Sequence, residues 1–489
     1  MTRSEARTMR PDAALEGSPY QSYLYAYPHK TAYRRIEPAL PLGPLWAGER
    51  RDALFLYVHV PFCEQRCGFC NLFTQPVPEG DRVEAYLATL ERQAAVVRRA
   101  LDEGGAFAIA RAALGGGTPT LLDARQLERV LGVMQRVGYA RAPMSVETSP
   151  ETALPERLAV VVGGGADRIS IGVQSFVDDE CRAVNRPQRA ADVHRALRAI
   201  RDAGPAALNI DLMYGLPGQT DATWRASLEA ALAYAPEELY LYPLYVRPLT
   251  TLGRKAARAG GGAGAALAAN GAPQAPADAE QDRRRLALYE QGRDLLRAAG
   301  YEQVSMRMFR RAPAAGAADS AAAAADSAAA AAAPAAPVYC CQDDGMIGLG
   351  VGARSYTRGV HYSSEWAVGA RGVREIIDRW LATPDAGFAV ADYGFVLDPD
   401  EQRRRWLILS LLSAEGLDLA AYRRRFARDA GDDFPELAEL ARRGLAAATS
   451  TPSGSALRLT PAGLARADAI GPWLGSLAVR HRMAEYELT

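Results

Sequence analysis

Apolar runs of strand length alternate with helix-like stretches through the first half of the chain. Six runs predict buried strands, at residues 54–60, 110–115, 144–148, 168–173, 208–215 and 239–245. Amphipathic segments lie between them, for example those that begin at residues 81 and 123, and Asp123 is placed to cap the second helix. Strands that alternate with helices predict a parallel sheet. Six such units predict an α/β fold built on a partial (β/α)6 TIM-like barrel, which would form the core at residues 51–258.

The remainder of the chain changes character several times. Residues 259–280 and 312–337 are alanine-rich, low-complexity stretches that cannot specify a packed core, so we expect surface insertions without catalytic residues. Residues 281–311 predict a helix and a strand that complete the core, and the run GMIGLGVGARSY predicts a further strand within a connecting region at 338–398. Three short helices, a hairpin around TSTPSGSALRLT and a last helix from Pro461 predict a C-terminal helical, winged-helix-like domain at 399–489. A tyrosine-rich arm occupies residues 1–50.

Charge and hydropathy narrow the possible functions. Lys+Arg and Asp+Glu both number 57, so the net charge is zero and gives no support for nucleic-acid binding. The terminal domain mixes acidic and basic residues, so packing or a lid role fits it better than DNA binding. No segment approaches the ~20 apolar residues of a membrane span, and residues 1–17 lack the apolar core of a signal peptide. We therefore expect a cytoplasmic protein, in which closely spaced cysteines favour metal or redox chemistry over disulfides.

Half of the six cysteines lie in the stretch LYVHVPFCEQRCGFCNLF (56–73), directly after the first predicted strand. Cys63, Cys67 and Cys70 form a C-x3-C-x2-C pattern, and one short loop can direct three thiolates at a soft metal centre. A structural zinc site is the alternative, but it usually requires a fourth ligand. The neighbouring positions offer only His59, on the strand, and Leu72. An iron–sulfur cube held by three cysteines leaves one iron open to another ligand.

Polar or glycine-rich features recur where the other predicted strands end, which is the face on which barrel enzymes build their sites. The stretch GGGTPT (115–120) follows the second strand, and its glycines allow a close backbone approach to a ligand. Later strands end near polar residues: Glu147, Gln174, the pair Asn185 and Arg186, and Asp211. Taken alone, each of these residues is explained as a capping residue or as a solvated side chain. In a barrel, however, all of them would lie at the same rim.

The cysteine pattern at the end of a first barrel strand, with Phe69 just before the last cysteine, resembles the radical S-adenosylmethionine (SAM) superfamily. The resemblance implies a [4Fe-4S] cluster whose open iron binds SAM. One electron from the cluster then cleaves SAM to a 5′-deoxyadenosyl radical that abstracts hydrogen from a substrate. It also implies an electron-donor protein such as flavodoxin or ferredoxin.

Within the superfamily, the chain resembles the oxygen-independent coproporphyrinogen III oxidases and the related haem chaperones. This resemblance extends from Tyr57 to Tyr245, resumes at the segment GLGVGARSY and continues more weakly through the terminal domain. The resemblance implies that Glu147 accepts hydrogen bonds from ribose hydroxyls and that Arg186 binds a carboxylate. Packing within the strand is an equal alternative for Tyr57. The implied cofactor-binding residues are Tyr57, Phe69, Gly116, Gly117, Thr118, Glu147, Gln174, Arg186 and Asp211, and the implied cluster ligands are Cys63, Cys67 and Cys70.

The chain departs from both relatives, which suggests a divergent branch. Leu72 stands where the oxidases carry a further cysteine, and VYCCQDDGMIG stands where the chaperones carry a haem-binding stretch. The leading hypothesis is a radical SAM oxidoreductase that acts on a porphyrinogen or similarly carboxylated substrate, with oxidative decarboxylation as the model reaction. A haem-delivering chaperone-like protein is the alternative, and a DNA-binding regulator with a redox-sensing cluster is a third. We assign no catalytic residue.

Several further residues have open roles. Aromatic faces in the arm and on the last strand could line a flat macrocycle, although packing explains them equally, and Arg247 could bind a substrate carboxylate. Cysteines outside the loop could be ligands or small buried residues, and histidines could bind haem or be structural. The residues concerned are Tyr20, Tyr23, Tyr25, Tyr27, Tyr33, Tyr240, Tyr242, Tyr245, Arg247, Cys181, Cys340, Cys341, His29 and His361.

Overall fold

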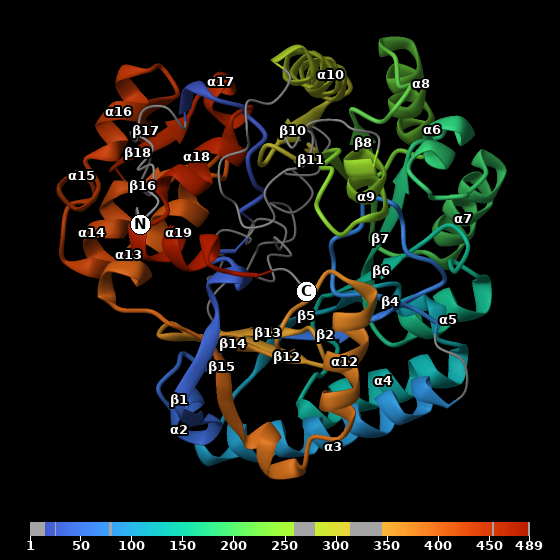
Figure 1. The fold of residues 1–489 in the computed structure, drawn as a ribbon, viewed down its shortest axis with the longest axis vertical. Helices are drawn as coiled ribbons and strands as arrows, with labels where there is room; N and C mark the ends of the chain where they lie inside the picture. The colour runs from blue at the N-terminus through green and yellow to red at the C-terminus, as the bar shows by residue number, and fades with distance from the viewer. Residues whose placement is uncertain are drawn as a thin grey trace, which may run out of the picture.

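A parallel sheet curved into a partial barrel forms the centre of the molecule (Figure 1). The computed structural model describes residues 15–24, 26–77, 81–258, 279–312, 345–451 and 454–487. All six predicted strands are present, and β12 (Met346–Leu349), from the glycine-rich run, adds a seventh parallel strand beside β2. The six are β2 (Leu54–Val60), β5 (Ile109–Gly116), β6 (Met144–Thr148), β7 (Ala166–Gln174), β8 (Ala207–Tyr214) and β9 (Glu238–Pro243). The predicted partial barrel is confirmed.

Antiparallel strands extend this sheet at both edges, so that it has 13 strands in the order β1-β15-β14-β13-β12-β2-β5-β6-β7-β8-β9-β11-β10 among the described residues. Six of its strands lie outside the seven parallel ones, and only one of these six, within residues 281–311, was predicted. Four of the six are only three or four residues long, and such short strands carry little periodicity. The six strands are β1 (Arg34–Pro41), β10 (Tyr301–Gln303), β11 (Met308–Arg311), β13 (Arg354–Tyr356), β14 (Val360–Ser363) and β15 (Val390–Val396). Residues 281–311 thus hold two strands rather than the one predicted.

Helices pack against the outer face of the strands (Figure 1). Helix α4 (Ala124–Val137) starts with a capping box between Asp123 and Gln126, as predicted for Asp123, and buries Leu127, Val130 and Met134 at helical spacing. The other helices of this part of the chain are α2 (Leu42–Ala47), α3 (Arg82–Glu103), α5 (Pro155–Gly163), α6 (Asp178–Ala183), α7 (Ala190–Ala203), α8 (Asp221–Leu232), α9 (Thr251–Arg258), α10 (Ala279–Ala298) and α12 (Ala370–Leu381). Three single turns of 3-10 helix accompany them: η1 (Lys30–Ala32), η2 (Pro119–Leu121) and η3 (Asp385–Ala389).

The C-terminal domain lies beside the barrel and has its own apolar core (Figure 1). Its hairpin and the short strand β16 form a three-stranded sheet in the order β16-β18-β17. The predicted last helix from Pro461 is wrong in one respect: the segment forms three short helices, interrupted at Arg466 and Gly475. The elements are α13 (Pro399–Leu411), β16 (Leu417–Asp418), α14 (Leu419–Phe426), α15 (Ala430–Asp433), α16 (Glu436–Arg442), β17 (Ala446–Thr451), β18 (Gly454–Leu459), α17 (Pro461–Leu464), α18 (Ala467–Leu474) and α19 (Leu477–Ala484).

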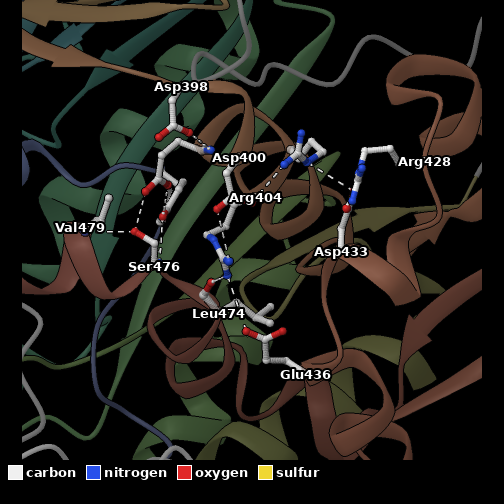
Figure 2. Close-up of polar contacts among 12 residues, drawn as sticks. Asp398, Asp400, Arg404, Arg428, Asp433, Glu436, Leu474, Ser476 and Val479 are labelled. Atoms are coloured by element: carbon white, nitrogen blue, oxygen red, sulfur yellow. Dashed lines mark hydrogen bonds and ion pairs between the residues drawn. The ribbon is translucent and has the colours of Figure 1, made fainter.

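Polar contacts hold the helices of this domain together (Figure 2). Arg404 of α13 donates to the Leu474 carbonyl oxygen at 2.7 Å and forms ion pairs with Asp400 and Glu436. Nearby, Asp433 accepts from Arg428 at 2.5 Å. The Arg404 contacts fix α13 against α16 and α18.

The N-terminal arm is anchored to the C-terminal domain. The hydroxyl of Tyr27 donates to Glu401 at 2.5 Å, and Arg405 donates to the Tyr27 carbonyl oxygen at 2.8 Å. Leu24 and Tyr33 belong to the apolar core of that domain. The arm therefore spans from the C-terminal domain to β1, which pairs with β15 at the edge of the main sheet.

Candidate functional site

The three cysteines of the C-x3-C-x2-C pattern lie on one loop at the carboxyl end of β2. The two-residue strands β3 (Phe62–Cys63) and β4 (Gln75–Pro76) pair at the base of this loop. The Gly68 N–H donates to the Val184 carbonyl oxygen at 2.8 Å, which fixes the loop against the segment after α6. Cys63, Cys67 and Cys70 are half-buried free thiols that line one pocket of about 190 Å³.

Each thiol has a polar neighbour. Arg186 donates from Nη1 to the Cys67 sulfur at 3.1 Å, and Thr118 donates to the Cys63 sulfur at 3.7 Å. The Cys70 sulfur lies 3.7 Å from the Thr74 hydroxyl oxygen. Burial, followed by the neighbouring Cys70, raises the pKa of Cys63 to about 12. This thiol therefore becomes a thiolate ligand only when a metal centre compensates the charge.

The glycine motif passes directly over the cysteine loop. The Gly117 N–H donates to the Val60 carbonyl oxygen at 2.7 Å, and a Cβ atom on Gly117 would overlap the Phe62 carbonyl oxygen and lie 2.9 Å from the Cys63 sulfur. Gly116 has a φ of +117° and donates its N–H to Glu147 at 3.0 Å. Close approach and a left-handed backbone explain why these positions are glycine.

Two carboxylates face the same pocket from the strands on either side of β7. Glu147 ends β6, and Asp211 lies on β8, where Asn209 donates to its Oδ1 at 2.8 Å. Burial raises the pKa of Glu147 to about 7, and burial raises that of Asp211 to about 6 against the opposing effect of the Asn209 donor. The Glu147 side chain is nevertheless exposed toward the pocket space, so a ligand that fills the pocket would complete its desolvation.

Arg186 is held by three acceptors. Besides its contact with Cys67, it donates from Nε to Gln188 at 2.8 Å and from Nη2 to the Gly172 carbonyl oxygen at 2.5 Å. A guanidinium has five N–H donors, so two remain for a ligand in the pocket. The Arg186 side chain can thus donate to the Cys67 thiol and, at the same time, to an anionic group of a ligand in the pocket.

One pocket contains every predicted cofactor-binding residue and cluster ligand except Tyr57. The Tyr57 hydroxyl lies 3.2 Å from Nδ1 of His59, and its side chain lines an adjoining cavity instead. Packing and ligand contact therefore both stay open for this residue. The residues that the pocket brings together are Cys63, Cys67, Phe69, Cys70, Gly116, Gly117, Thr118, Glu147, Gln174, Arg186 and Asp211.

The donor set fits an iron–sulfur cluster. Within the described ranges, no group of three or more His, Cys, Asp or Glu side chains, the three cysteines included, is placed to hold a single metal ion. The three thiols instead surround a pocket, and a multi-iron cluster spans more space than a single ion. Thiolates are the protein ligands of such clusters, and N–H donors to sulfur, such as Arg186, are typical of their surroundings.

The adjoining cavity has a volume of about 490 Å³. The residues that it shares with the cysteine pocket are Phe69, Cys70, Leu72, Gly116, Glu147, Gln174 and Asp211. Aromatic residues and cations dominate the rest of its wall. The aromatic residues include Tyr23, Tyr57, Tyr242, Tyr245 and Trp366, and the cations are Lys30, Arg247, Arg307 and Arg354.

The other predicted residues have mixed outcomes. Tyr23, Tyr242, Tyr245, Arg247 and His29 line the adjoining cavity. Packing explains several others: Tyr20, Tyr27, Tyr33, Cys181 and His361 are buried, and Tyr240 stacks on Tyr242. Tyr25, Cys340 and Cys341 lie outside the described residues.

Among the cavity residues that sequence reasoning missed are three of the four cations and a tryptophan. Lys30 carried a usable signal, because it is one of two lysines in a chain whose other basic residues are arginine. Arg307, Arg354 and Trp366 carried none, since they come from edge strands and connections that local patterns do not predict.

Comparison with known proteins agrees with this geometry. The Radical SAM superfamily model matches residues 57–231, and the HemN C-terminal domain model matches residues 397–466. The oxygen-independent coproporphyrinogen III oxidase of Paracoccus denitrificans is 33% identical over 308 residues, which are 61% of this chain and 62% of that protein. The haem chaperone HemW of Bacillus subtilis is 32% identical over 197 residues, which are 40% of this chain and 51% of that protein. The chain thus spans only between half and two-thirds of the length of these two curated relatives.

The similarity in fold to a solved structure covers nearly the whole chain. The structure of coproporphyrinogen III oxidase (HemN) from Escherichia coli aligns with a TM-score of 0.68 and 22% identity, covering 92% of this chain and 96% of that one. No helix within the described segments is long and apolar enough to cross a membrane. Residues 57–231 therefore form a radical SAM superfamily domain and residues 397–466 a HemN C-terminal domain, with relatives among the coproporphyrinogen III oxidases and haem chaperones at 32–33% identity.

Proposed function

We propose that the protein is a radical SAM enzyme that acts on a flat, carboxylated substrate such as a porphyrinogen. The observation that carries this proposal is the aromatic and cationic cavity that adjoins the cysteine pocket. Tyrosine and tryptophan faces suit a planar ring system, and the cationic side chains of Lys30, Arg247 and Arg354 suit its carboxylates. The shared wall of the two cavities would keep such a substrate close to the cofactors.

The proposal gives each part of the cysteine pocket a task. Cys63, Cys67 and Cys70 would hold a [4Fe-4S] cluster, which, with SAM bound, supplies one-electron cleavage to a 5′-deoxyadenosyl radical. Glu147 would accept hydrogen bonds from ribose hydroxyls in its ionised form, and Arg186 would offer its remaining N–H groups to a carboxylate. An external protein such as flavodoxin or ferredoxin would supply the electron.

A haem-delivering role is the second candidate, because a haem chaperone is among the relatives. His29 lines the adjoining cavity and is a candidate haem ligand, whereas two other histidines of the described residues disfavour this role. Both ring nitrogens of His59 have partners, namely Tyr57 and the Phe73 carbonyl oxygen at 3.0 Å. His361 is fully buried and lines neither cavity. Leu72, which is 49% exposed, stands where the resemblance places a further cysteine in the oxidases, and the absence of that cysteine favours the chaperone-like role.

The test is anaerobic reconstitution with iron and sulfide, followed by measurement of 5′-deoxyadenosine with SAM and a low-potential reductant, with and without coproporphyrinogen III. The enzyme proposal expects the tetrapyrrole to accelerate 5′-deoxyadenosine formation. Tight stoichiometric haem uptake without acceleration would support the carrier instead. A reconstituted protein that holds no iron–sulfur cluster would refute both.

A substitution in the cavity sharpens this test. Arg247→Gln should raise the KM for the tetrapyrrole roughly tenfold or more, because a hydrogen bond to a charged group contributes about 1.5–3 kcal/mol. Arg371→Gln is the matched control, since the Arg371 side chain is 93% exposed and forms its ion pair with Glu375, four residues along the same helix. Equal KM values for the two variants would show that Arg247 does not bind the substrate.

A further inference from the structure

A buried carboxylate of the C-terminal domain reaches the wall of the adjoining cavity. Asp468, on α18, is 1% exposed, and its partner Arg307 is 3% exposed. Arg307 donates from Nη1 to Oδ1 of Asp468 at 2.9 Å and from Nη2 to Oδ2. The Tyr245 hydroxyl also donates to Oδ2 of Asp468. One carboxylate thus fixes two cavity-lining side chains that come from different parts of the barrel.

The same residue also fixes the N-terminal arm. The Ser22 N–H donates to the backbone carbonyl oxygen of Asp468 at 3.0 Å. Next to Ser22, the ring of Tyr23 covers the Arg307 guanidinium, with 3.7 Å between the ring centroid and Cζ. The Tyr23 ring meets Tyr242 edge to face, with 6.4 Å between centroids. Arm, barrel and C-terminal domain therefore meet at Asp468.

Charge compensation gives this arrangement a consequence for the cavity. A guanidinium held flat by a two-pronged contact with a carboxylate is neutralised, and its face is free to stack on an aromatic ring. Without the carboxylate, Arg307 would be a buried charge without compensation, and it would turn toward the cavity or admit water. With it, this wall presents the rings of Tyr23, Tyr242 and Tyr245 as a neutral aromatic surface.

We propose that Asp468 is a positioning residue for the substrate: from the C-terminal domain it holds Arg307, Tyr245 and Tyr23 as a neutral aromatic wall that receives the face of a planar ring. This inference rests on the proposed function, because it takes the adjoining cavity as the substrate site. It assigns the C-terminal domain a part in recognition without contact between Asp468 and the ligand.

The test compares Asp468→Asn with Asp433→Asn in the full-length protein. Asp433 is a matched control because its carboxylate is also buried and accepts from a tyrosine, Tyr422 at 2.7 Å, and from an arginine, Arg428 at 2.5 Å. Neither cavity includes Asp433. Both substitutions should lower the urea midpoint, so stability alone does not separate them.

Two other measurements do separate them. The first is the Kd for coproporphyrin III, followed by its absorbance: Asp468→Asn should raise it at least tenfold, and Asp433→Asn less than twofold. The second is hydrogen exchange of residues 18–24 and 238–246, which should accelerate only in Asp468→Asn. If Asp468→Asn does not yield folded protein, Arg307→Lys, which keeps the charge and loses the two-pronged contact, should raise the Kd at least threefold.

The outcomes distinguish this inference from the proposed function. Equal behaviour of the two aspartate variants in both measurements would overturn the positioning role. A wild-type protein that binds no coproporphyrin III would overturn the tetrapyrrole proposal instead. In that case the exchange measurement alone decides whether Asp468 holds the wall.

Discussion

Replacing Gly117 with alanine should disturb the cluster site directly. The added Cβ would overlap the Phe62 carbonyl oxygen and lie 2.9 Å from the Cys63 sulfur. The first neighbour is backbone, so no side-chain rotation relieves the overlap, and the glycine segment must move away from the cysteine loop. That movement would strain the bonds from the Gly117 N–H to the Val60 oxygen at 2.7 Å and from the Thr118 N–H to the Phe62 oxygen at 2.8 Å.

The magnitude follows from these contacts. Overpacking by one methyl group costs about 1–3 kcal/mol, and each weakened backbone hydrogen bond adds about 1 kcal/mol. With two such bonds, we expect the free energy of unfolding to fall by about 3–5 kcal/mol. Because Cys63 must shift with the loop, the variant should also bind less than half the wild-type amount of iron after reconstitution.

Urea denaturation of the metal-free protein measures the first effect, and iron content with the brown absorbance measures the second. Gly163→Ala is the matched control: Gly163 is the last residue of α5, and nothing lies within 4 Å of an added Cβ. This control should be neutral or slightly stabilising, because alanine favours a helix over glycine. If Gly117→Ala matched Gly163→Ala in both stability and iron content, the close approach of the two segments would be wrong.

Three further predictions concern the same pocket. Cys67→Ala should abolish the cluster absorbance. Cys181→Ala should keep it, since Cys181 is buried and lines neither cavity. Loss of the absorbance in both variants would disprove the ligand assignment. Arg186→Gln should shift the midpoint potential of the cluster, measured without SAM, to more negative values. The reason is that a cationic donor to the Cys67 sulfur stabilises the reduced cluster. An unchanged potential would contradict the 3.1 Å contact between Arg186 and the Cys67 sulfur. The folded-state pKa of Glu147 is about 7, against an ordinary value of 4.5. Between pH 4.5 and 7 the folded state therefore binds more protons than the unfolded state, and the free energy of unfolding should fall as the pH rises through this range. Glu147→Gln should flatten this decline in urea midpoints between pH 5 and 8, by less than the full shift implies because the side chain faces open pocket space, and an unaltered slope would refute the assignment.

The sequence by itself determined the elements with strong local periodicity and the residues with distinctive chemistry. Runs such as 208–215 are long, apolar and bounded by turns, so their strand character is a local property. The cysteine loop and the glycine motif each lie within a few residues of a strand end. Parallel strands meet at one edge of a sheet, and this rule was sufficient to predict that Glu147 and Asp211 share a pocket with the cysteines.

Only the tertiary structure decided the adjoining cavity and its supports. Lys30, Arg307 and Asp468 are far apart in the chain, and in sequence each is one more charged residue among many. Long-range packing of the arm and the C-terminal domain against the barrel brings Arg307 and Asp468 into a buried ion pair and sets Lys30 in the cavity wall. Local patterns register the periodicity of a single element, whereas burial and charge compensation depend on which elements pack together.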